Sequence, residues 1–491
     1  MIVVRLLRAF RAPAARPSAL LCASGLTLVL SARPASAQSG RLTGRVVDKV
    51  AGVSLPYSGV SIVGQWVEQL TSDSGAFHFD LTPGTVRLRI RHVGFTPVDT
   101  QVVVRANDTT RITIELARIP VTLAAMRVTD VPCRLPGAPA ASGDALPQVF
   151  EQLQLNAEQF RLVSMQYPFS SVVERRFSRL VEEPKAAGKP DTARAGKDTL
   201  EVVTRTDSIT VPSNQRWRYK PGDIIVTAGV SALGVRYAVM IPTLAVFADP
   251  EFVKHHCFQD AGEVTLEGQA YRRIDFKAAE DIDDPDIDGT MYLDPATFVI
   301  RRSVISLSRK SRYTISYDSV VVETIFDELV SGVPVITRST GRNALTADAG
   351  RPGRGSPLPN GSRFLSDGEL QRVREIRFAR DVPGSSDATA PGRRAPRAVR
   401  LDGPIGHHRV LGVFDGESGE PVAGAAVRDS ASGKSALTTA TGTVNLAFVP
   451  RSSAIIQIEH AGYERASTPV SLTLTDTLPV TVVLRRSRAP R

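Results

Sequence analysis

Residues 71–95 read TSDSGAFHFDLTPGTVRLRIRHVGF, and a weaker copy of this stretch, TTATGTVNLAFVPRSSAIIQIEHAGY, occupies residues 438–463. The copies keep a nearly constant offset, because Gly75 corresponds to Gly442 (367 positions on) and Gly94-Phe95 to Gly462-Tyr463 (368 positions on). One small module therefore occurs twice, and the copies bracket a long middle region of the 491-residue chain.

The first copy extends outward from this stretch into a series of short alternating segments. Phe77 and Phe79 share one face of a predicted strand, because successive side chains of a strand point to opposite sides. Pro83-Gly84 and Asn107-Asp108 supply turns between later segments. About seven strands at spacings of 8 to 12 residues predict a small β-sandwich.

These residues resemble the carboxypeptidase regulatory-like domain, a transthyretin-like β-sandwich. The resemblance lies in five matching motifs: Gly44-x-Val46-x-Asp48, Leu55-Pro56-x-x-Gly59-Val60, Thr71-x-Asp73-x-Gly75-x-Phe77, Pro83-Gly84 and Gly94-Phe95. The second copy keeps Gly412-x-x-x-Asp415, Glu420-Pro421-Val422-x-Gly424-Ala425-x-Val427 and Gly462-Tyr463. It replaces Pro-Gly with Pro450-Arg451, so the resemblance implies the same fold rather than a shared site.

The middle region predicts one helix within residues 144–163, followed by long alternating strands. Its turn Gly289-x-x-Tyr292-x-Asp294-Pro295-x-Thr297 resembles the half-barrel of outer-membrane lipoprotein carriers. We therefore expect a mainly β protein, in which two small transthyretin-like β-sandwiches flank a central antiparallel α+β, half-barrel-like domain.

The organisation along the chain starts with a predicted secretory signal peptide at residues 1–37, because an arginine-bearing start precedes a short apolar run and Ala35-Ser36-Ala37. The rest divides into the first sandwich (38–130), the central domain (131–381, with loops at 182–198 and 342–362), an Arg/Pro/Gly-rich linker (382–408) and the second sandwich (409–486). No transmembrane segment is expected after cleavage, and the predicted location is periplasmic, outer-membrane-associated or extracellular.

The positive charge is concentrated in two places. The chain carries a formal net charge of +10, of which the predicted signal peptide holds five arginines. Residues 351–408 contain eleven arginines and six acidic residues, with few aromatic residues that could stack on bases. A solvated segment is the preferred interpretation, and nucleic acid is not an expected partner.

Two cysteines, Cys133 and Cys257, follow the predicted signal peptide. In an oxidising compartment an isolated pair favours a disulfide over two free thiols. Closing a loop of this length would stabilise the fold by about 4 to 5 kcal/mol in the chain-entropy model. We therefore predict the Cys133–Cys257 bond, and a structural role for the neighbouring His255 and His256.

The candidate catalytic and metal-binding motifs of the sequence are incomplete. None of the seven histidines is followed three residues later by Glu, so the metallocarboxypeptidase zinc motif is missing from the sequence. Asp284, Asp286 and Asp288 with Gly289 match the first half of a calcium loop, but Pro295 stands where the bidentate Glu belongs. They are weak calcium candidates, and an acidic turn is preferred. We expect no catalytic residue, no metal and no cofactor, while the ligand-binding residues are unknown.

The leading interpretation is a non-catalytic secreted envelope protein that acts in binding, adhesion or scaffolding. One alternative is a periplasmic lipid or lipoprotein carrier, which needs an unfilled apolar concavity in the central domain. Another is a carbohydrate-binding protein, for which Trp66 and Trp217 are the available tryptophans. The expected partner is accordingly an envelope or surface protein, a lipid or a glycan.

Overall fold

The computed structural model describes residues 39–65, 67–119, 133–134, 136–137, 146–183, 198–214, 218–231, 234–309, 317–346, 362–380, 398–401, 407–448, 453–475 and 479–487. Among these residues strands predominate, with three helices, and the prediction of a mainly β fold is confirmed. The predicted signal peptide, Trp66, Trp217 and most of the predicted loop and linker segments lie outside the described residues.

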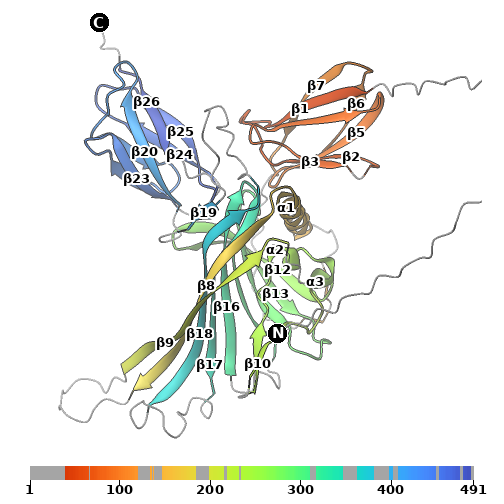
Figure 1. Cartoon of the computed structure of the whole chain (residues 1–491), viewed down its shortest axis with the longest axis vertical. Helices are drawn as coiled ribbons and strands as arrows, with labels where there is room; N and C mark the ends of the chain where they lie inside the picture. Colours follow the sequence, from red (N-terminus) through yellow and green to blue (C-terminus); the bar gives the residue numbers. More distant parts are fainter. Residues whose placement is uncertain are drawn as a thin grey trace, which may run out of the picture. The chain divides into compact units, whose positions relative to one another are not determined.

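The first sandwich consists of two sheets with the orders β4-β1-β7 and β3-β2-β5-β6 (Figure 1). Strand β1 pairs in parallel with β7 and antiparallel with β4. The alternating side chains of both sheets meet in one apolar core that includes Phe77, Phe79 and Phe95. Its strands are β1 (Gly40–Asp48), β2 (Gly59–Ile62), β3 (Glu68–Leu70), β4 (Ala76–Leu81), β5 (Gly84–Arg91), β6 (Val98–Val104) and β7 (Thr109–Leu116).

The second sandwich repeats this topology, with the orders β23-β20-β26 and β22-β21-β24-β25. Its parallel pair is β20 with β26, the counterpart of β1 with β7. A separate apolar core fills it. Its strands are β20 (His407–Asp415), β21 (Ala426–Asp429), β22 (Ser435–Leu437), β23 (Thr443–Phe448), β24 (Ser453–Glu459), β25 (Ala466–Ser471) and β26 (Val480–Leu484).

A ten-stranded sheet forms the middle of the chain, in the order β12-β13-β14-β15-β16-β17-β18-β8-β9, with β19 (Ala398–Arg400) paired to β18. Its strands pair antiparallel throughout. They are β8 (Phe169–Glu183), β9 (Asp198–Pro212), β12 (His256–Leu266), β13 (Gln269–Ala278), β14 (Ile287–Leu293), β15 (Ile300–Leu307), β16 (Tyr317–Val330), β17 (Val333–Leu345) and β18 (Arg363–Phe378).

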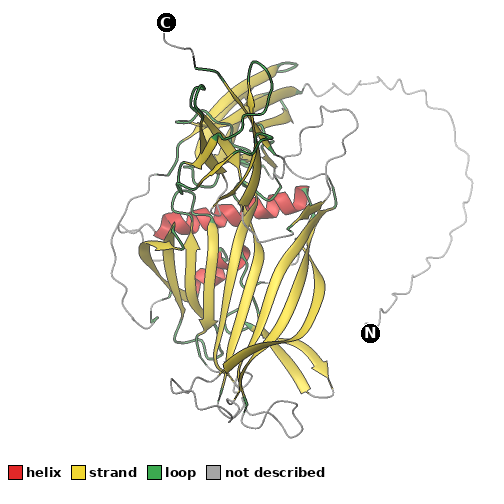
Figure 2. Ribbon diagram, turned by 90° about the vertical axis from the view of Figure 1, so that its left-hand side faces the viewer, coloured by secondary structure: helices red, strands yellow, loops and turns green. Residues whose placement is uncertain are grey.

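Helix α1 (Leu146–Gln166) crosses strands of this sheet (Figure 2). It corresponds to the predicted helix, and Val149, Phe150 and Leu153 of its apolar side enter the sheet's largest core. Two short helices, α2 (Leu244–Phe247) and α3 (Pro250–Lys254), also cover this core. These helices were not predicted, because four or five residues are too few to display a helical period. The hairpin of β10 (Ile225–Ser231) and β11 (Gly234–Val239) was missed as well.

Candidate functional site

The predicted disulfide residues lie together. Cys133 and Cys257 are bonded, with Cα atoms 5.5 Å apart. His255 and His256 do not face a common point: Nδ1 of His255 lies 2.8 Å from the carbonyl oxygen of Glu251, whereas Nδ1 of His256 lies 2.8 Å from that of Phe252. The ring of His256 is buried and stacks on Phe252 at 3.9 Å. Both histidines thus contact the protein's own backbone.

Two of the three acidic calcium candidates, Asp286 and Asp288, have structural partners, whereas Asp284 is exposed. The carboxylate of Asp286 is buried and accepts hydrogen bonds from the Tyr219 hydroxyl (2.6 Å) and the Gly222 N–H (2.9 Å). Asp288 accepts from the N–H of Ala278 at 2.8 Å. Within the described part of the chain, no group of three His, Cys, Asp or Glu side chains could hold a metal ion. The turn that they form is held by protein donors.

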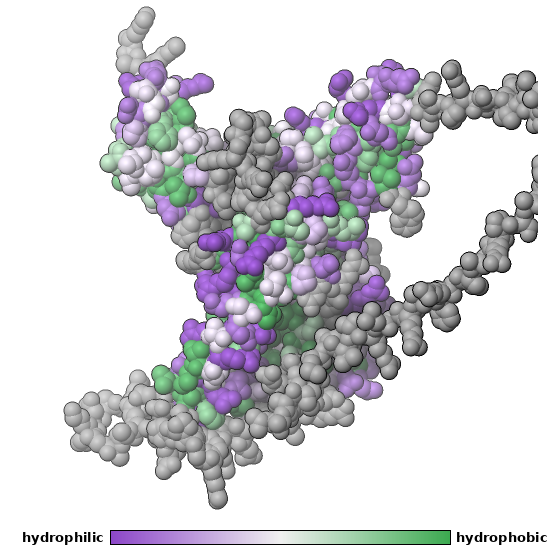
Figure 3. Space-filling view, viewed as in Figure 1, coloured by the Kyte–Doolittle hydropathy of each residue, from purple (hydrophilic) through white to green (hydrophobic). Residues whose placement is uncertain are grey.

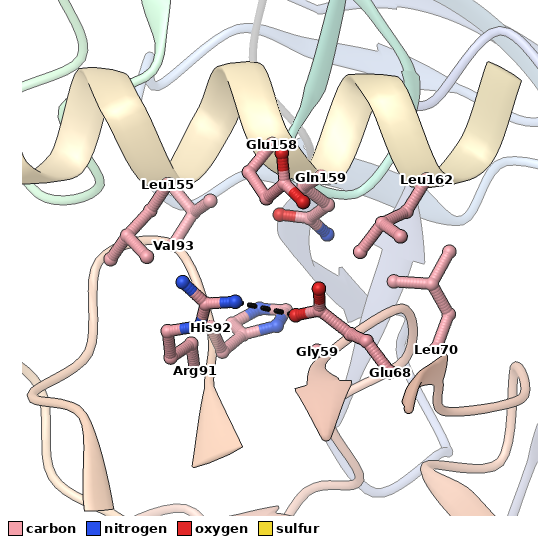
Figure 4. Close-up of a pocket in the computed structure, with 10 residues that line it drawn as sticks. All are labelled: Gly59, Glu68, Leu70, Arg91, His92, Val93, Leu155, Glu158, Gln159 and Leu162. Carbon is pink, nitrogen blue, oxygen red and sulfur yellow. Dashed lines mark hydrogen bonds and ion pairs between the residues drawn. The ribbon is translucent and has the colours of Figure 1, made fainter. Parts of the chain in front are cut away.

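A cavity lies where the first sandwich meets helix α1, with about 270 Å³ of empty space including open solvent (Figure 4). The sandwich contributes Gly59, Glu68, Leu70, Arg91, His92 and Val93, and α1 contributes Leu155, Glu158, Gln159 and Leu162. Arg91 and Glu68 form an ion pair at 2.5 Å that spans its floor. Glu158 is paired with Arg161 on its own helix, and this arginine, with Arg91 further off, holds the pKa of Glu158 below its usual value. The charged groups therefore neutralise one another.

The same contact carries buried amide groups from α1. The Gln152 side-chain oxygen accepts a hydrogen bond from the N–H of Gly94 at 2.9 Å. The Gln159 side-chain nitrogen donates to the carbonyl of Tyr57 at 2.7 Å and to that of Ser331 at 3.2 Å. Both glutamines are buried, so each bond satisfies a group that would otherwise be costly to bury. The cavity is part of a junction that joins the first sandwich, α1 and the β16–β17 turn.

Gly94, from the stretch that decides the fold, lies at the centre of this junction. Its φ is +81°, and a Cβ atom there would lie 3.0 Å from the Cα of Thr297. Thr297 belongs to the Asp294-Pro295 turn of the central sheet, where Asp294 accepts backbone hydrogen bonds from Ala296 and Thr297 at 3.0 Å each. The two turns that carried the sequence resemblances therefore contact each other.

His92 is buried directly beneath this turn. Its Nδ1 lies 3.0 Å from the hydroxyl of Ser58, whose own proton is directed to the carbonyl of Leu55. Nδ1 is therefore the protonated nitrogen of a neutral ring. Burial, assisted by the positive charge of Arg118, lowers the pKa of His92 to about 4. A neutral, enclosed imidazole here supports the sandwich rather than transferring protons.

The second sandwich has a surface equivalent to the one that forms the junction in the first sandwich. Among the described residues this surface forms no such junction. The N–H of Gly424 bonds to the carbonyl of Thr438 as that of Tyr57 bonds to Thr71, so Gly424 replaces Tyr57. Leu437 replaces Leu70 and is 66% exposed, whereas Leu70 is 6% exposed.

Three more positions of this surface in the second sandwich can be matched to positions in the first. Glu459 replaces Arg91, since each pairs with the first residue of the adjacent strand, Ala426 or Gly59. Ala461 and Gly462 replace Val93 and Gly94 and are exposed. A Cβ atom on Gly462 would meet nothing within 4 Å. We call Leu437, Glu459, Ala461 and Gly462 the open face of the second sandwich.

Sequence reasoning missed the residues that make the junction. Gln152 and Gln159 lie seven positions apart on α1, a spacing that puts both on one helical face. Two amides on one face signal a polar contact, but the sequence does not indicate the partner. Leu437 was missed because an aliphatic residue in a strand is expected to be buried.

Residues 41–117 match the family model of the carboxypeptidase regulatory-like domain, which confirms the predicted resemblance of the first sandwich. No curated protein matches the chain. No helix among the described residues is long and apolar enough to cross a membrane.

Three solved structures illustrate the partial structural likenesses. The minor pilin GBS52 of Streptococcus agalactiae is 18% identical with a TM-score of 0.16, over 18% of this chain and 49% of the pilin, so the chain spans about half its length. A putative carbohydrate binding protein from Bacteroides uniformis is 10% identical (TM-score 0.14; 50% and 92% covered). A LolA superfamily protein from Nitrosomonas europaea is 12% identical (TM-score 0.20; 46% and 93% covered).

Proposed function

We propose that the protein is a non-catalytic, extracytoplasmic binding or scaffolding protein, in which the second sandwich presents a docking surface to an envelope or surface protein. The observation that carries this proposal is the exposure of Leu437, 66% against 6% for its counterpart Leu70. The same surface of the first sandwich is used for docking within the chain, so its geometry suits a protein contact. The proposed domain limits are those predicted above.

The chemistry of the buried groups supports a binding role over catalysis. Asp48 and Asp415 each accept an arginine, Arg118 at 2.9 Å and Arg486 at 2.7 Å, at the equivalent strand end of the two sandwiches. In the central sheet, buried Arg301 pairs with Glu328 at 2.5 Å, and buried Arg272 pairs with Asp260. These groups hold elements together, and none of these four pairs lines the junction cavity.

The carrier alternative receives less support from the central sheet. Its concave side is lined by aromatic side chains such as Phe276, and α2 and α3 add Phe247 and Phe252 to the same buried core. A lipid carrier needs apolar lining without such filling. The compartment itself is proposed from the predicted signal peptide, and the Cys133–Cys257 bond is compatible with an oxidising environment.

Site-specific photo-crosslinking in cells tests the proposed surface. A photoreactive phenylalanine analogue would replace Leu437 in one variant and Val50, an 87% exposed residue of the first sandwich, in another. We expect a discrete protein adduct at position 437 and none at position 50. Equal labelling at both positions, or no adduct at 437 while the protein is correctly folded, would reject the open face as a docking surface.

A further inference from the structure

The face of the central sheet that points away from the helices carries arginines without acidic partners. Inner side chains such as Phe276, Met291 and Val322 pack in the core that includes α1 to α3. The alternation of each strand then puts the outer face at the neighbouring positions, which include Arg338 and Arg342 of β17, Arg372 of β18 and Arg176 of β8. Arg176, Arg338 and Arg342 are exposed, and Arg372 is half-buried.

These four arginines gather on three adjacent strands. Arg338 on β17 lies directly opposite Arg372 on β18. On its other side, Arg372 lies directly opposite Glu174 on β8. Thr340, Leu370 and Arg176 form the next row, and Arg342 starts the row after it. Directly opposite side chains lie about 5 Å apart at Cβ, where like charges are destabilising. The Arg338–Arg372 contact is therefore unfavourable, and Glu174, on the other side of Arg372, is already paired with Arg374.

The carboxylates of this face are engaged by other arginines. Glu174 is bound by Arg374 at 2.8 Å, and Glu323 by Arg302 at 2.6 Å. Arg374, followed by Arg372 and Arg176, holds the pKa of Glu174 below its usual value, so this carboxylate is ionised and already paired. Among the described residues, Arg338, Arg372, Arg342 and Arg176 have no carboxylate within ion-pair distance. We call these four residues the arginine patch.

Arginines recur along one cross-strand row of the sheet, in which Arg273 is paired with Asp275 and Arg302 with Glu323. The cross-strand register runs Arg273, Tyr292, Arg302, Ile325, Arg338 and Arg372 over the adjacent strands β13 to β18. At about 4.8 Å between strands, the row spans roughly 24 Å. The four unpaired arginines of the patch spread over three adjacent strands and three successive rows, which fits a linear polyanion better than one small anion. The planar guanidinium suits carboxylates, which it binds through two parallel hydrogen bonds.

The side chains around the patch indicate what kind of polyanion fits. Hydroxyl groups of Thr340, Ser178 and Thr206 share the outer face with the arginines, by the same register. Among the described residues, the aromatic rings on this face are Tyr271 and Tyr292 at one end, where they contact each other edge to face at 6.0 Å. Base stacking, on which single-stranded nucleic acid binding depends, therefore has no platform within the patch. In the space-filling view, hydrophilic and apolar residues are interspersed on the described part of the sheet (Figure 3).

We propose that the outer face of β17, β18 and β8 binds an acidic polysaccharide, whose carboxylates pair with the arginine patch and whose hydroxyls meet its threonine and serine side chains. This site lies on the central sheet and is separate from the open face of the second sandwich. Binding here neutralises the opposed arginines, which offsets their unfavourable interaction in the free protein.

Isothermal titration of the full chain with polygalacturonate, a linear sugar-carboxylate polymer, tests the proposal. The variant R338S/R372S removes the opposed pair, and R105S/R111S removes two exposed arginines of the first sandwich, so both lose the same charge. We expect binding that weakens at least about tenfold in R338S/R372S and less than about twofold in R105S/R111S. Neutral dextran should not bind. The melting temperature of R338S/R372S should equal or exceed that of the parent, because like charges are removed.

Several outcomes would overturn this assignment. An equal loss of binding in both double variants would mean that polygalacturonate is attracted only by the net charge of the protein. Binding to phosphatidylglycerol vesicles or to a single-stranded oligonucleotide, with none to polygalacturonate at low salt, would identify a membrane or a nucleic acid as the partner instead. A lower melting temperature in R338S/R372S would show that the arginines are structural. None of these outcomes would affect crosslinking at Leu437.

Discussion

The two sandwiches share a topology but differ on one surface. In the first, the turn at Gly94 packs on the Asp294-Pro295 turn, and the N–H of Gly94 donates to the side-chain oxygen of Gln152 on α1. In the second, the equivalent turn at Gly462 has open space around it. The same backbone thus supports an internal joint in one copy and a free surface in the other. The difference lies in a few side chains at equivalent positions of the two sandwiches. Single substitutions at each pair of equivalent positions can test it.

The largest difference should come from the paired leucines. Leu70 is buried among residues of α1 and the β16–β17 region, so Leu70→Ala removes packing and leaves a cavity. We expect a loss of about 3 kcal/mol in the stability of the first sandwich. Leu437→Ala, at an exposed position, should change the second sandwich by less than about 0.5 kcal/mol. Amide hydrogen exchange resolved by mass spectrometry would measure the stability of each sandwich separately. A large loss of stability in both variants would contradict the expected difference between Leu70 and Leu437.

His92 should make the stability of the first sandwich depend on pH. Because the pKa of His92 is about 4 in the folded state and about 6.5 when unfolded, the unfolded chain binds more protons between these values. Stability of the first sandwich should therefore fall as the pH decreases, by about 2 kcal/mol between pH 7 and pH 5. His92→Gln should remove this part of the pH dependence, as judged from exchange rates across the pH range. An unchanged slope in His92→Gln would show that His92 is not the titrating group, and His460→Gln provides the comparison in the second sandwich.

The paired glycines separate backbone strain from the contact at the junction. Both have positive φ, +81° for Gly94 and +85° for Gly462, so alanine should cost about 1 kcal/mol at either position. Gly94→Ala also brings a Cβ atom to 3.0 Å from the Cα of Thr297, a backbone atom that cannot move away cheaply. We expect Gly94→Ala to cost about 1 kcal/mol more than Gly462→Ala and to increase hydrogen exchange in α1. Equal costs, with α1 unaffected, would argue against the junction.

The sequence anticipated the repeated module because glycines, prolines and aromatic residues at turns and core positions leave a local pattern. Gly75 and Gly442, for example, both have positive φ and would clash with neighbouring backbone if substituted. The helix at residues 146–166 was also anticipated, because its apolar positions follow a helical period. These features depend on neighbours along the chain.

The junction and the arginine patch could not be predicted, because each joins residues that are distant in sequence. Gln159 bonds to Tyr57 and Ser331, which lie 102 and 172 positions away. Arg176 and Arg372 come together only through the register of β8 with β18. In the sequence, Arg372 belonged to an arginine-rich stretch that we interpreted as a solvated segment. The structure instead places it on the outer face of a strand.

The two sandwiches also differ in the hydrogen-bond partner of each histidine. Ser58 accepts from His92 at 3.0 Å, whereas Ala425 stands at the equivalent position in the second sandwich, and Nδ1 of His460 has no hydrogen-bond partner among the described residues. The equivalence of Ser58 and Ala425 follows from their N–H groups, which bond to Thr71 and Thr438. Ala425→Ser should therefore supply the missing partner and stabilise the second sandwich by about 0.5 to 1 kcal/mol, whereas Ser58→Ala should destabilise the first by about 1 to 2 kcal/mol. If Ala425→Ser is destabilising in hydrogen exchange, the second sandwich has lost room for the hydroxyl, and the two copies have diverged inside their cores as well as on their surfaces.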